Sequence, residues 1–147
     1  MTAAPSLVEI ARGIITRVAA DGEHTTVAIP GGGPNGLAVG PDGALYCCNN
    51  GGFLWHEEPG MLRPVGTPGD YSGGRIERID PETGEVNVLY THCGEHALRG
   101  PNDIVFDAAG GFYFTDLGKT HRGTGSSAAS TTPWRTARRS SRSRIRC

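Results

Sequence analysis

The chain has 147 residues, a formal net charge of −1, 23 glycines and only 7% aromatic residues. This length is enough for one domain with a hydrophobic core, and the balanced charge argues against a nucleic-acid or membrane-surface partner. No apolar run reaches transmembrane length, and the N-terminus lacks the pattern of a signal peptide. The four cysteines show neither disulfide nor zinc spacing, so we expect a reduced, cytoplasmic protein.

The first expected element is a hairpin near the N-terminus. Residues 13–18 and 25–28 are β-compatible runs on either side of a turn at 21–22. Alternation of apolar and polar residues around a glycine turn predicts half-buried strands. The same kind of hairpin returns later, where residues 74–80 and 85–90 flank a Pro-Glu-Thr-Gly turn. We refer to these two as outer hairpins.

A different kind of hairpin lies between them, and it occurs twice. Residues 34–46 align without a gap with residues 101–113; both copies begin with Pro-Asn and end with Tyr. Each copy holds a short apolar run, a turn with a glycine available for positive φ, and a returning run rich in aromatic residues or cysteine. Self-similarity at long spacing indicates an array of one supersecondary unit. These are the inner hairpins.

Outer and inner hairpins alternate along the chain. An inner hairpin followed by an outer one makes a four-stranded antiparallel sheet, which is one blade of a β-propeller. The predicted fold class is therefore all-β, a β-propeller, with about two blades in residues 1–122: a complete blade at about 34–91 and half a blade on either side. A Pro- and Gly-rich insertion at about 54–73 lengthens the complete blade. Two unrelated hairpins in a sandwich would not explain why the hairpins alternate in kind.

Residues 123–147 differ in composition from everything before them. They are rich in Arg and Ser and poor in apolar residues, which is typical of a disordered basic tail. An arm that binds nucleic acid is one interpretation. We favour a shifted reading frame, because the genetic code permits residues 128–137 to be read one frame over as Gly-Val-Tyr-Tyr-Ala-Leu-Ala-Asp-Gly. This shifted sequence would encode an outer strand and its turn, which is the next element expected in the alternation of inner and outer hairpins.

The repeated Asn35 and Asn102 are the candidate site residues that the pattern itself supplies. In a propeller, both lie just before an inner strand and hence at one end of the central channel. A single Asn there is explained by a turn cap, but a repeated one suggests oxygen ligands for a hard cation such as Ca²⁺. His92, Cys93 and His96 resemble a metal cluster only in spacing; without a helix there, we expect a solvated loop.

Four segments together resemble the gluconolactonase/regucalcin (senescence marker protein) family: 33–43, 71–76, 99–103 and 112–116. The resemblance extends over about residues 8–122. It implies a six-bladed propeller in the intact family, with a divalent cation, often Ca²⁺, in the central channel. The cation polarises a sugar lactone or related ester for hydrolysis.

The resemblance also implies roles for four residues. Asn102 matches the asparagine that opens the third blade, which makes it the implied metal ligand. Arg99 lies one position away from a family residue that contacts substrate, and Asn35 and Asp103 are the other implied substrate contacts. We assign no catalytic acid or base, because the Glu-Gly-Pro metal motif is absent and the later Asn and Asp of the family would fall beyond the tail.

The expected function is a metal-dependent hydrolase acting on a sugar lactone or related ester, here as an incomplete and inactive fragment. The alternative is a propeller-repeat module that binds or scaffolds without chemistry. The recurrent asparagine at the channel end favours the hydrolase, because a bare binding propeller does not need it. For this polypeptide's own activity, we favour the reading that it is the inactive product of a damaged frame.

Overall fold

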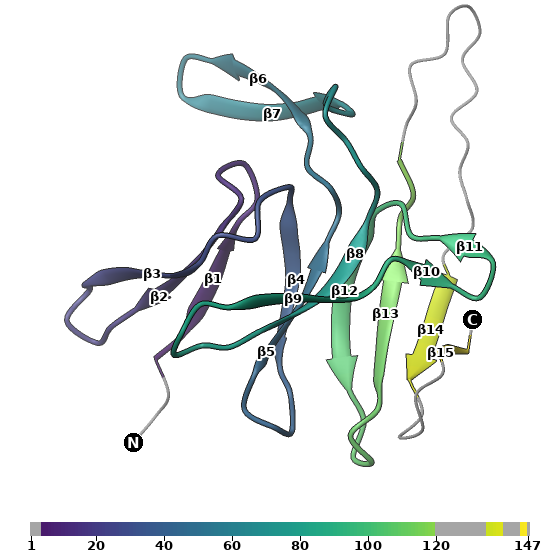
Figure 1. Ribbon diagram of the computed structural model, residues 1–147. Helices are drawn as coiled ribbons and strands as arrows, with labels where there is room; N and C mark the ends of the chain where they lie inside the picture. The colour runs from purple at the N-terminus through teal and green to yellow at the C-terminus, as the bar shows by residue number, and fades with distance from the viewer. Residues whose placement is uncertain (1–3, 120–134, 140–144, 147) are drawn as a thin grey trace, which may run out of the picture.

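The computed structural model describes residues 4–119, 135–139 and 145–146 (Figure 1). Every regular element in this part of the chain is a β-strand, so it contains no helix that could span a membrane. The strands are β1 Ser6–Glu9, β2 Ile14–Val18, β3 His24–Ala28, β4 Pro34–Val39, β5 Leu45–Asn49, β6 Leu54–Glu58, β7 Met61–Gly66, β8 Arg75–Ile79, β9 Val86–Tyr90, β10 His92–Cys93, β11 His96–Ala97, β12 Pro101–Phe106, β13 Phe112–Asp116, β14 Arg135–Arg139 and β15 Ile145–Arg146.

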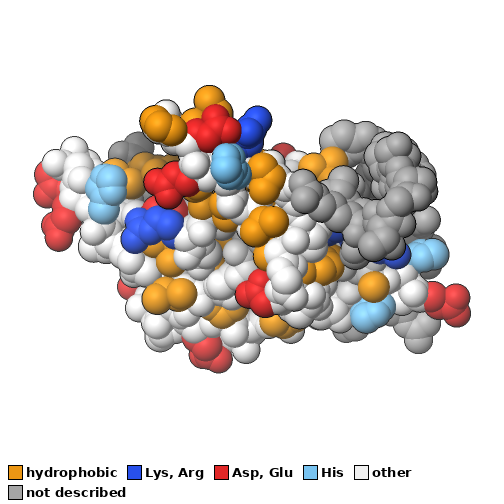
Figure 2. Space-filling view, turned by 90° about the horizontal axis from the view of Figure 1, so that it is seen from above, with side chains coloured by type: hydrophobic (Ala, Val, Ile, Leu, Met, Phe, Trp, Pro, Cys, Tyr) orange, Lys and Arg blue, Asp and Glu red, His pale blue; other side chains and the backbone are white. Residues whose placement is uncertain are grey.

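Three antiparallel sheets form the body of the molecule, in the orders β1-β2-β3, β4-β5-β8-β9 and β12-β13-β14-β15. The second sheet is the complete blade expected at about 34–91, built from an inner hairpin (β4-β5) and an outer one (β8-β9). The first sheet has one strand more than the predicted outer hairpin, because Ser6–Glu9 pairs along Ile14–Arg17. The predicted insertion folds as the hairpin β6-β7, which projects beyond the end of the sheets where β5 finishes (Figure 1). Seen from above, this end of the molecule carries hydrophobic side chains interspersed with charged ones (Figure 2).

The second sheet is the shared wall of two hydrophobic cores. Between it and the first sheet lie Ile15, Ala28, Leu45, Cys47 and Ile79. Its other face meets the third sheet through a larger cluster that contains Cys48, Ile76 and Phe112. The neighbours Cys47 and Cys48 therefore point to opposite faces, as the two-residue period of a strand requires. Burial raises the pKa of both thiols, that of Cys47 to about 12.

Two expectations need correction around the link between the second and third sheets. His92–Cys93 and His96–Ala97 pair as a short hairpin, β10-β11, where we expected a solvated loop. Cys93 is buried and disulfide-bonded, so the expectation of four reduced thiols is wrong for this residue. Cys47 and Cys48 are free. The strand pairing brings His92 opposite Ala97, and no group of three metal-binding side chains is found within the described ranges.

The boundary between residues 122 and 123 stays a prediction. Most of 123–147 lies outside the described residues, including the segment 128–134 at the centre of the frameshift hypothesis. The described parts of this stretch are β14, which pairs with β13 from Tyr113 to Asp116, and β15, which pairs with β14.

Candidate functional site

The two repeated asparagines lie side by side at one end of the sheets. Asn35 Nδ2 donates a hydrogen bond of 2.8 Å to Asn102 Oδ1, joining the second residue of β4 to the second residue of β12. In both copies the strand register shifts directly after the proline, between Pro34 and Leu37 and between Pro101 and Ile104. Such irregularities re-aim side chains. The structure therefore joins two of the four residues that the family resemblance pointed to by a direct hydrogen bond.

These asparagines line an open cavity of about 530 Å³ between the inner strands and β1. Asp103 lines it too, and so does Glu9 from the first sheet. The Glu9 carboxylate accepts bonds from Thr16 Oγ1 at 2.5 Å and Arg12 Nη1 at 2.7 Å, and these bonds lower its pKa. The sequence analysis gave Glu9 no role, and the structure makes it the first sheet's carboxylate at this cavity.

Asp103 and Arg99 are exposed at the same end of the third sheet. The Asp103 carboxylate accepts a bond from the backbone N–H of Ile104 at 2.9 Å, which stabilises the start of the inner strand. Arg99 is held by its backbone rather than its side chain: its N–H donates to Asp116 Oδ2 at 2.8 Å and its carbonyl accepts from Tyr71 at 2.6 Å. The Arg99 side chain is thus carried by a fixed segment that leads directly into Asn102.

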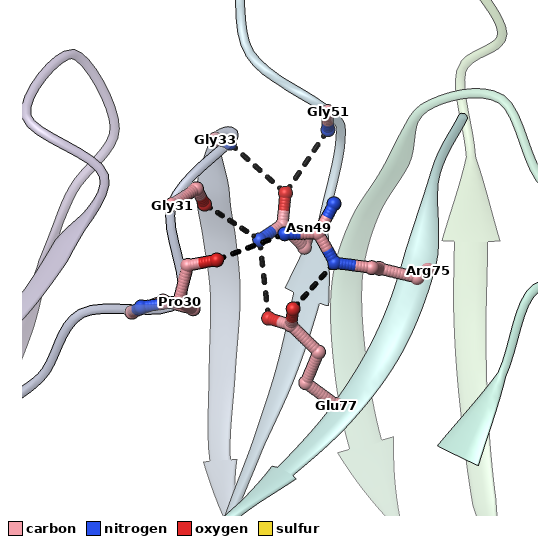
Figure 3. A network of polar contacts seen from close by, with 7 residues as sticks. All are labelled: Pro30, Gly31, Gly33, Asn49, Gly51, Arg75 and Glu77. Carbon is pink, nitrogen blue, oxygen red and sulfur yellow. Dashed lines mark hydrogen bonds and ion pairs between the residues drawn. The ribbon is translucent and has the colours of Figure 1, made fainter. Parts of the chain in front are cut away.

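A buried polar network fixes the loop before Asn35, and sequence reasoning missed it (Figure 3). Asn49 Oδ1 accepts from the N–H groups of Gly33 and Gly51 at 2.9 and 3.0 Å. Its Nδ2 donates to the Gly31 carbonyl at 2.9 Å and to Glu77 Oε2 at 3.1 Å. Asn49 therefore uses its full amide to hold the glycine loop in place.

Glu77 is the charged member of this network. It is 1% exposed and pairs with Arg75, whose Nε lies 2.5 Å from Glu77 Oε1. Burial outweighs the attraction of Arg75 and raises the pKa of Glu77. Arg75 in turn donates to the Pro30 carbonyl at 3.0 Å. The ion pair braces the turn that precedes β4 and does not reach the cavity lining.

Asp116 occupies the corresponding place in the third sheet. Just as Asn49 pairs with Pro34 across the inner hairpin, Asp116 pairs with Pro101. Its carboxylate accepts from the N–H groups of Arg99, Gly100 and Gly118 at 2.7 to 2.8 Å. The last residue of the second inner strand is thus a backbone cap in both sheets, and Asp116 has a structural role rather than a catalytic one.

The oxygen atoms at the cavity are of the kind that a hard cation binds, but they are too few to complete its coordination. Glu9 and Asp103 offer carboxylate oxygens, and Asn35 and Asn102 offer amide oxygens. Ca²⁺ takes six to eight oxygen ligands. Here the Glu9 carboxylate is engaged by Thr16 and Arg12, and Asn102 Oδ1 accepts from Asn35. The described residues therefore fit part of a cation site, and other ligands would have to complete it.

Comparison with known protein families identifies the family of this chain. The profile of the SMP-30/Gluconolactonase/LRE-like region matches residues 3–142. The chain belongs to this family. A gluconolactonase of Zymomonas mobilis is 27% identical over 84 residues, which are 57% of this chain and 18% of that protein.

Two solved structures described as gluconolactonases share the fold. A gluconolactonase from Xanthomonas campestris superposes with a TM-score of 0.64 at 18% identity, covering 96% of this chain and 42% of its own. A second structure, described as a putative gluconolactonase, gives a TM-score of 0.61 at 16% identity, covering 95% of this chain and 43% of its own. The predicted family and the all-β propeller class are confirmed. The chain spans less than half the length of these relatives.

Proposed function

We propose that this chain is the lactone-binding portion of a hydrolase that acts on a sugar lactone or related ester with the help of a divalent cation, most simply Ca²⁺. The observation that carries the proposal is the bond between Asn35 and Asn102 at the wall of the 530 Å³ cavity. The family supplies the reaction class, since its relatives include proteins described as gluconolactonases.

The paired amides are suited to a ligand with several hydroxyl groups. Their mutual bond engages Asn35 Nδ2 and Asn102 Oδ1. The opposite ends of the two amides, one acceptor and one donor, are then oriented for a hydroxyl or ring oxygen of the ligand. Asp103 lines the same cavity and adds an acceptor, whereas Arg99 lies outside the cavity lining and would have to reach the ligand from the segment before Asn102. These four residues would bind and orient the lactone.

Asn102 is the proposed protein ligand of the cation through the second lone pair of its Oδ1, and Glu9 and Asp103 are the carboxylates that line the same cavity. When bound, the cation supplies Lewis-acid polarisation of the carbonyl. The chain's own contribution is orientation, because the Glu9 carboxylate is engaged by Thr16 and Arg12 and we assign Asp103 to binding. We therefore propose that the 147-residue chain binds lactone without hydrolysing it.

Binding is tested by isothermal titration of the chain with a lactam analogue of a sugar lactone, in CaCl₂ and in EDTA. We expect binding that needs the cation and that weakens by about tenfold in Asn102→Ala, the equivalent of about 1.4 kcal/mol. Asn87→Ala is the matched control, because Asn87 is exposed on β9. Equal affinity in EDTA, or in Asn102→Ala, would rule the site out.

The reaction class is tested in a chimaera. Residues 4–119 replace the structurally aligned segment of the Xanthomonas campestris gluconolactonase, and lactone hydrolysis is followed by pH-stat. We expect cation-dependent hydrolysis that Asn102→Ala abolishes and Asn87→Ala leaves intact, and no hydrolysis above the spontaneous rate by the 147-residue chain. A folded chimaera that binds the lactam and never hydrolyses lactone would favour the binding-module alternative.

A further inference from the structure

Lys119 is the only lysine in the sequence, and it is buried where the second and third sheets meet the base of the β6-β7 hairpin. We propose that Lys119 is a positioning residue: it ties both stems of that hairpin to the end of β13 and thereby holds the segment that leads into Asn102. The part of this proposal that concerns ligand affinity rests on the proposed function. The part that concerns the tie does not.

The first stem is held through the loop after β5. Lys119 is 7% exposed, and its Nζ donates to the Gly52 carbonyl at 2.5 Å and lies 3.4 Å from Asn50 Oδ1. The same Nζ sits 3.9 Å from the centre of the Phe53 ring, a cation–π contact. Residues 50–52 are buried, and Phe53 directly precedes β6. One ammonium group therefore fixes the residues from which the hairpin rises.

The second stem is held through Tyr71, which follows β7. Lys119 Nζ lies 5.5 Å from the centre of the Tyr71 ring. The hydroxyl of Tyr71 donates to the Arg99 carbonyl at 2.6 Å. A side chain at Gly51 would come within 2.6 Å of the Tyr71 ring, so the two stems touch here. Lys119 and Tyr71 thus form one contact surface that reaches both stems and the Arg99 backbone.

The contacts of Lys119 and its neighbours hold the residues that lead into Asn102. Asp116, three residues before Lys119, accepts from the N–H groups of Arg99 and Gly100. Arg99 is consequently held from one side by Asp116 and from the other by Tyr71. If the contact between Tyr71 and Arg99 is loosened, the segment 99–102 can shift relative to the second sheet, where Asn35 is the hydrogen-bond partner of Asn102.

A merely space-filling role does not explain a lysine at this position. Burying an ammonium group costs free energy that a methionine of similar length would avoid. The loop also contains a second unfavourable group, since Asn50 Nδ2 is buried with no partner among the described residues. Lys119 leaves that amide nitrogen unsatisfied, but it offsets part of the cost of its own burial by donating to the Gly52 carbonyl and to Asn50 Oδ1. The charged and titratable groups facing it are Asp116, Tyr71 and, beyond Tyr71, Arg99.

The NMR signal of Lys119 gives a direct test, because protein labelled with ¹³C-lysine shows the resonances of a single lysine side chain. Burial lowers the pKa of Lys119 to about 8. We expect the ¹³Cε resonance to titrate with a midpoint near 8 and the ε protons to show upfield ring-current shifts from Phe53 and Tyr71. An unshifted resonance that titrates near the ordinary value of 10.5 would place the lysine in solvent and overturn the proposal.

Hydrogen exchange of the ligand-free chain tests the tie. In Lys119→Met we expect exchange at residues 50–53, 71–74 and 98–102 to rise at least tenfold, with β1–β3 unchanged and Lys119→Arg closer to wild type. Arg63→Met is the matched loss of a cation on the same hairpin, where Arg63 makes only an exposed pair with Glu58. Unchanged exchange at the three segments, or a uniform rise that includes β1–β3, would overturn the proposal.

Ligand affinity then tests positioning. With the lactam analogue and Ca²⁺, we expect affinity to fall at least fivefold in Lys119→Met, to recover in Lys119→Arg, and to be unaffected in Arg63→Met. Local loosening without loss of affinity would overturn the positioning role. If the wild-type chain does not bind the analogue, the proposed function fails, while the exchange at residues 98–102 still decides whether Lys119 holds that segment.

Discussion

Gly36 and Asn102 approach so closely that no side chain fits between their strands. A Cβ built on Gly36 would lie 2.5 Å from the Asn102 carbonyl oxygen and 2.6 Å from the Asp103 Cα. The backbone of Gly36 is not in the positive-φ region, so the requirement is one of space rather than of conformation. This contact lies directly beside the Asn35–Asn102 bond and sets how near the two inner strands can come.

Gly36→Ala should therefore destabilise the fold and separate the two asparagines. Overpacking of this kind costs about 1–3 kcal/mol, and we expect about 2 kcal/mol in urea unfolding. The control is Gly66→Ala, since a Cβ on Gly66 meets nothing within 4 Å and its φ is not positive. Equal stabilities for the two variants would show that β4 and β12 do not approach as described.

The pH dependence of Glu77 has a definite sign. Because its pKa is raised above the ordinary 4.5, the folded protein holds this proton more tightly than the unfolded chain does. Its contribution to the free energy of unfolding is therefore greatest below that value and falls as the pH rises through the raised pKa. Urea unfolding at pH 4 and pH 7 should show the wild type losing stability relative to Glu77→Gln on going to pH 7.

The exposed Glu85→Gln serves as control for that titration, because its side chain meets only the exposed Asn87. The difference between the Glu77→Gln and Glu85→Gln variants then isolates the effect of burying the carboxylate. If the wild type instead gains on Glu77→Gln between pH 4 and pH 7, the attraction of Arg75 exceeds the cost of burying the carboxylate.

Asn49→Ala should be among the most damaging polar substitutions in the described part of the chain. It leaves two buried N–H groups and the Glu77 carboxylate without the partners that Asn49 supplies. Unsatisfied buried groups cost about 1–3 kcal/mol each, so we expect a loss of at least about 3 kcal/mol in thermal or urea unfolding. Asn87→Ala should change stability by less than about 0.5 kcal/mol; a similar loss in both would contradict the assignment.

The free thiols should be unreactive in the folded protein. Cys47 and Cys48 are both 0% exposed, and burial raises their pKa values, so neither thiolate forms near neutral pH. Iodoacetamide at pH 8 should label neither residue until denaturant is added, as judged by peptide mass spectrometry. Labelling of either one at a rate close to that of a free peptide would show that the second sheet is not packed on both faces.

The repeat predicted the fold well, because a hairpin's turn chemistry and alternation are local properties. It also placed Asn35 and Asn102 at the same end of neighbouring sheets. The same alignment, continued three residues past Tyr46 and Tyr113, pairs Asn49 with Asp116, so the two backbone caps were available in the sequence. Their importance was missed because their partners are main-chain groups, which a sequence does not display.

Lys119 and Glu9 could not be found in this way. Lys119 is buried only because residues 50–53 and Tyr71, at the two ends of an insertion, fold against it. No local pattern encodes that contact. Glu9 reaches the cavity because Ser6–Glu9 pairs with β2, and a strand of four residues beside a glycine turn carries too little alternation to be recognised. Tertiary contacts therefore decide both positions.

The burial of β5 on both faces leaves its alignment open to error. Leu45, Tyr46, Cys47 and Cys48 are all buried, two toward each neighbouring sheet. A slip of one residue along β4 and β8 would exchange the faces without exposing any apolar side chain, so hydrophobicity alone does not exclude it. Asn49 does exclude it, because only one alignment lets its amide meet Gly31, Gly33, Gly51 and Glu77 together. In this sheet the side chain of Asn49 alone selects the alignment of β5 with β4, and that alignment determines the position of Asn35.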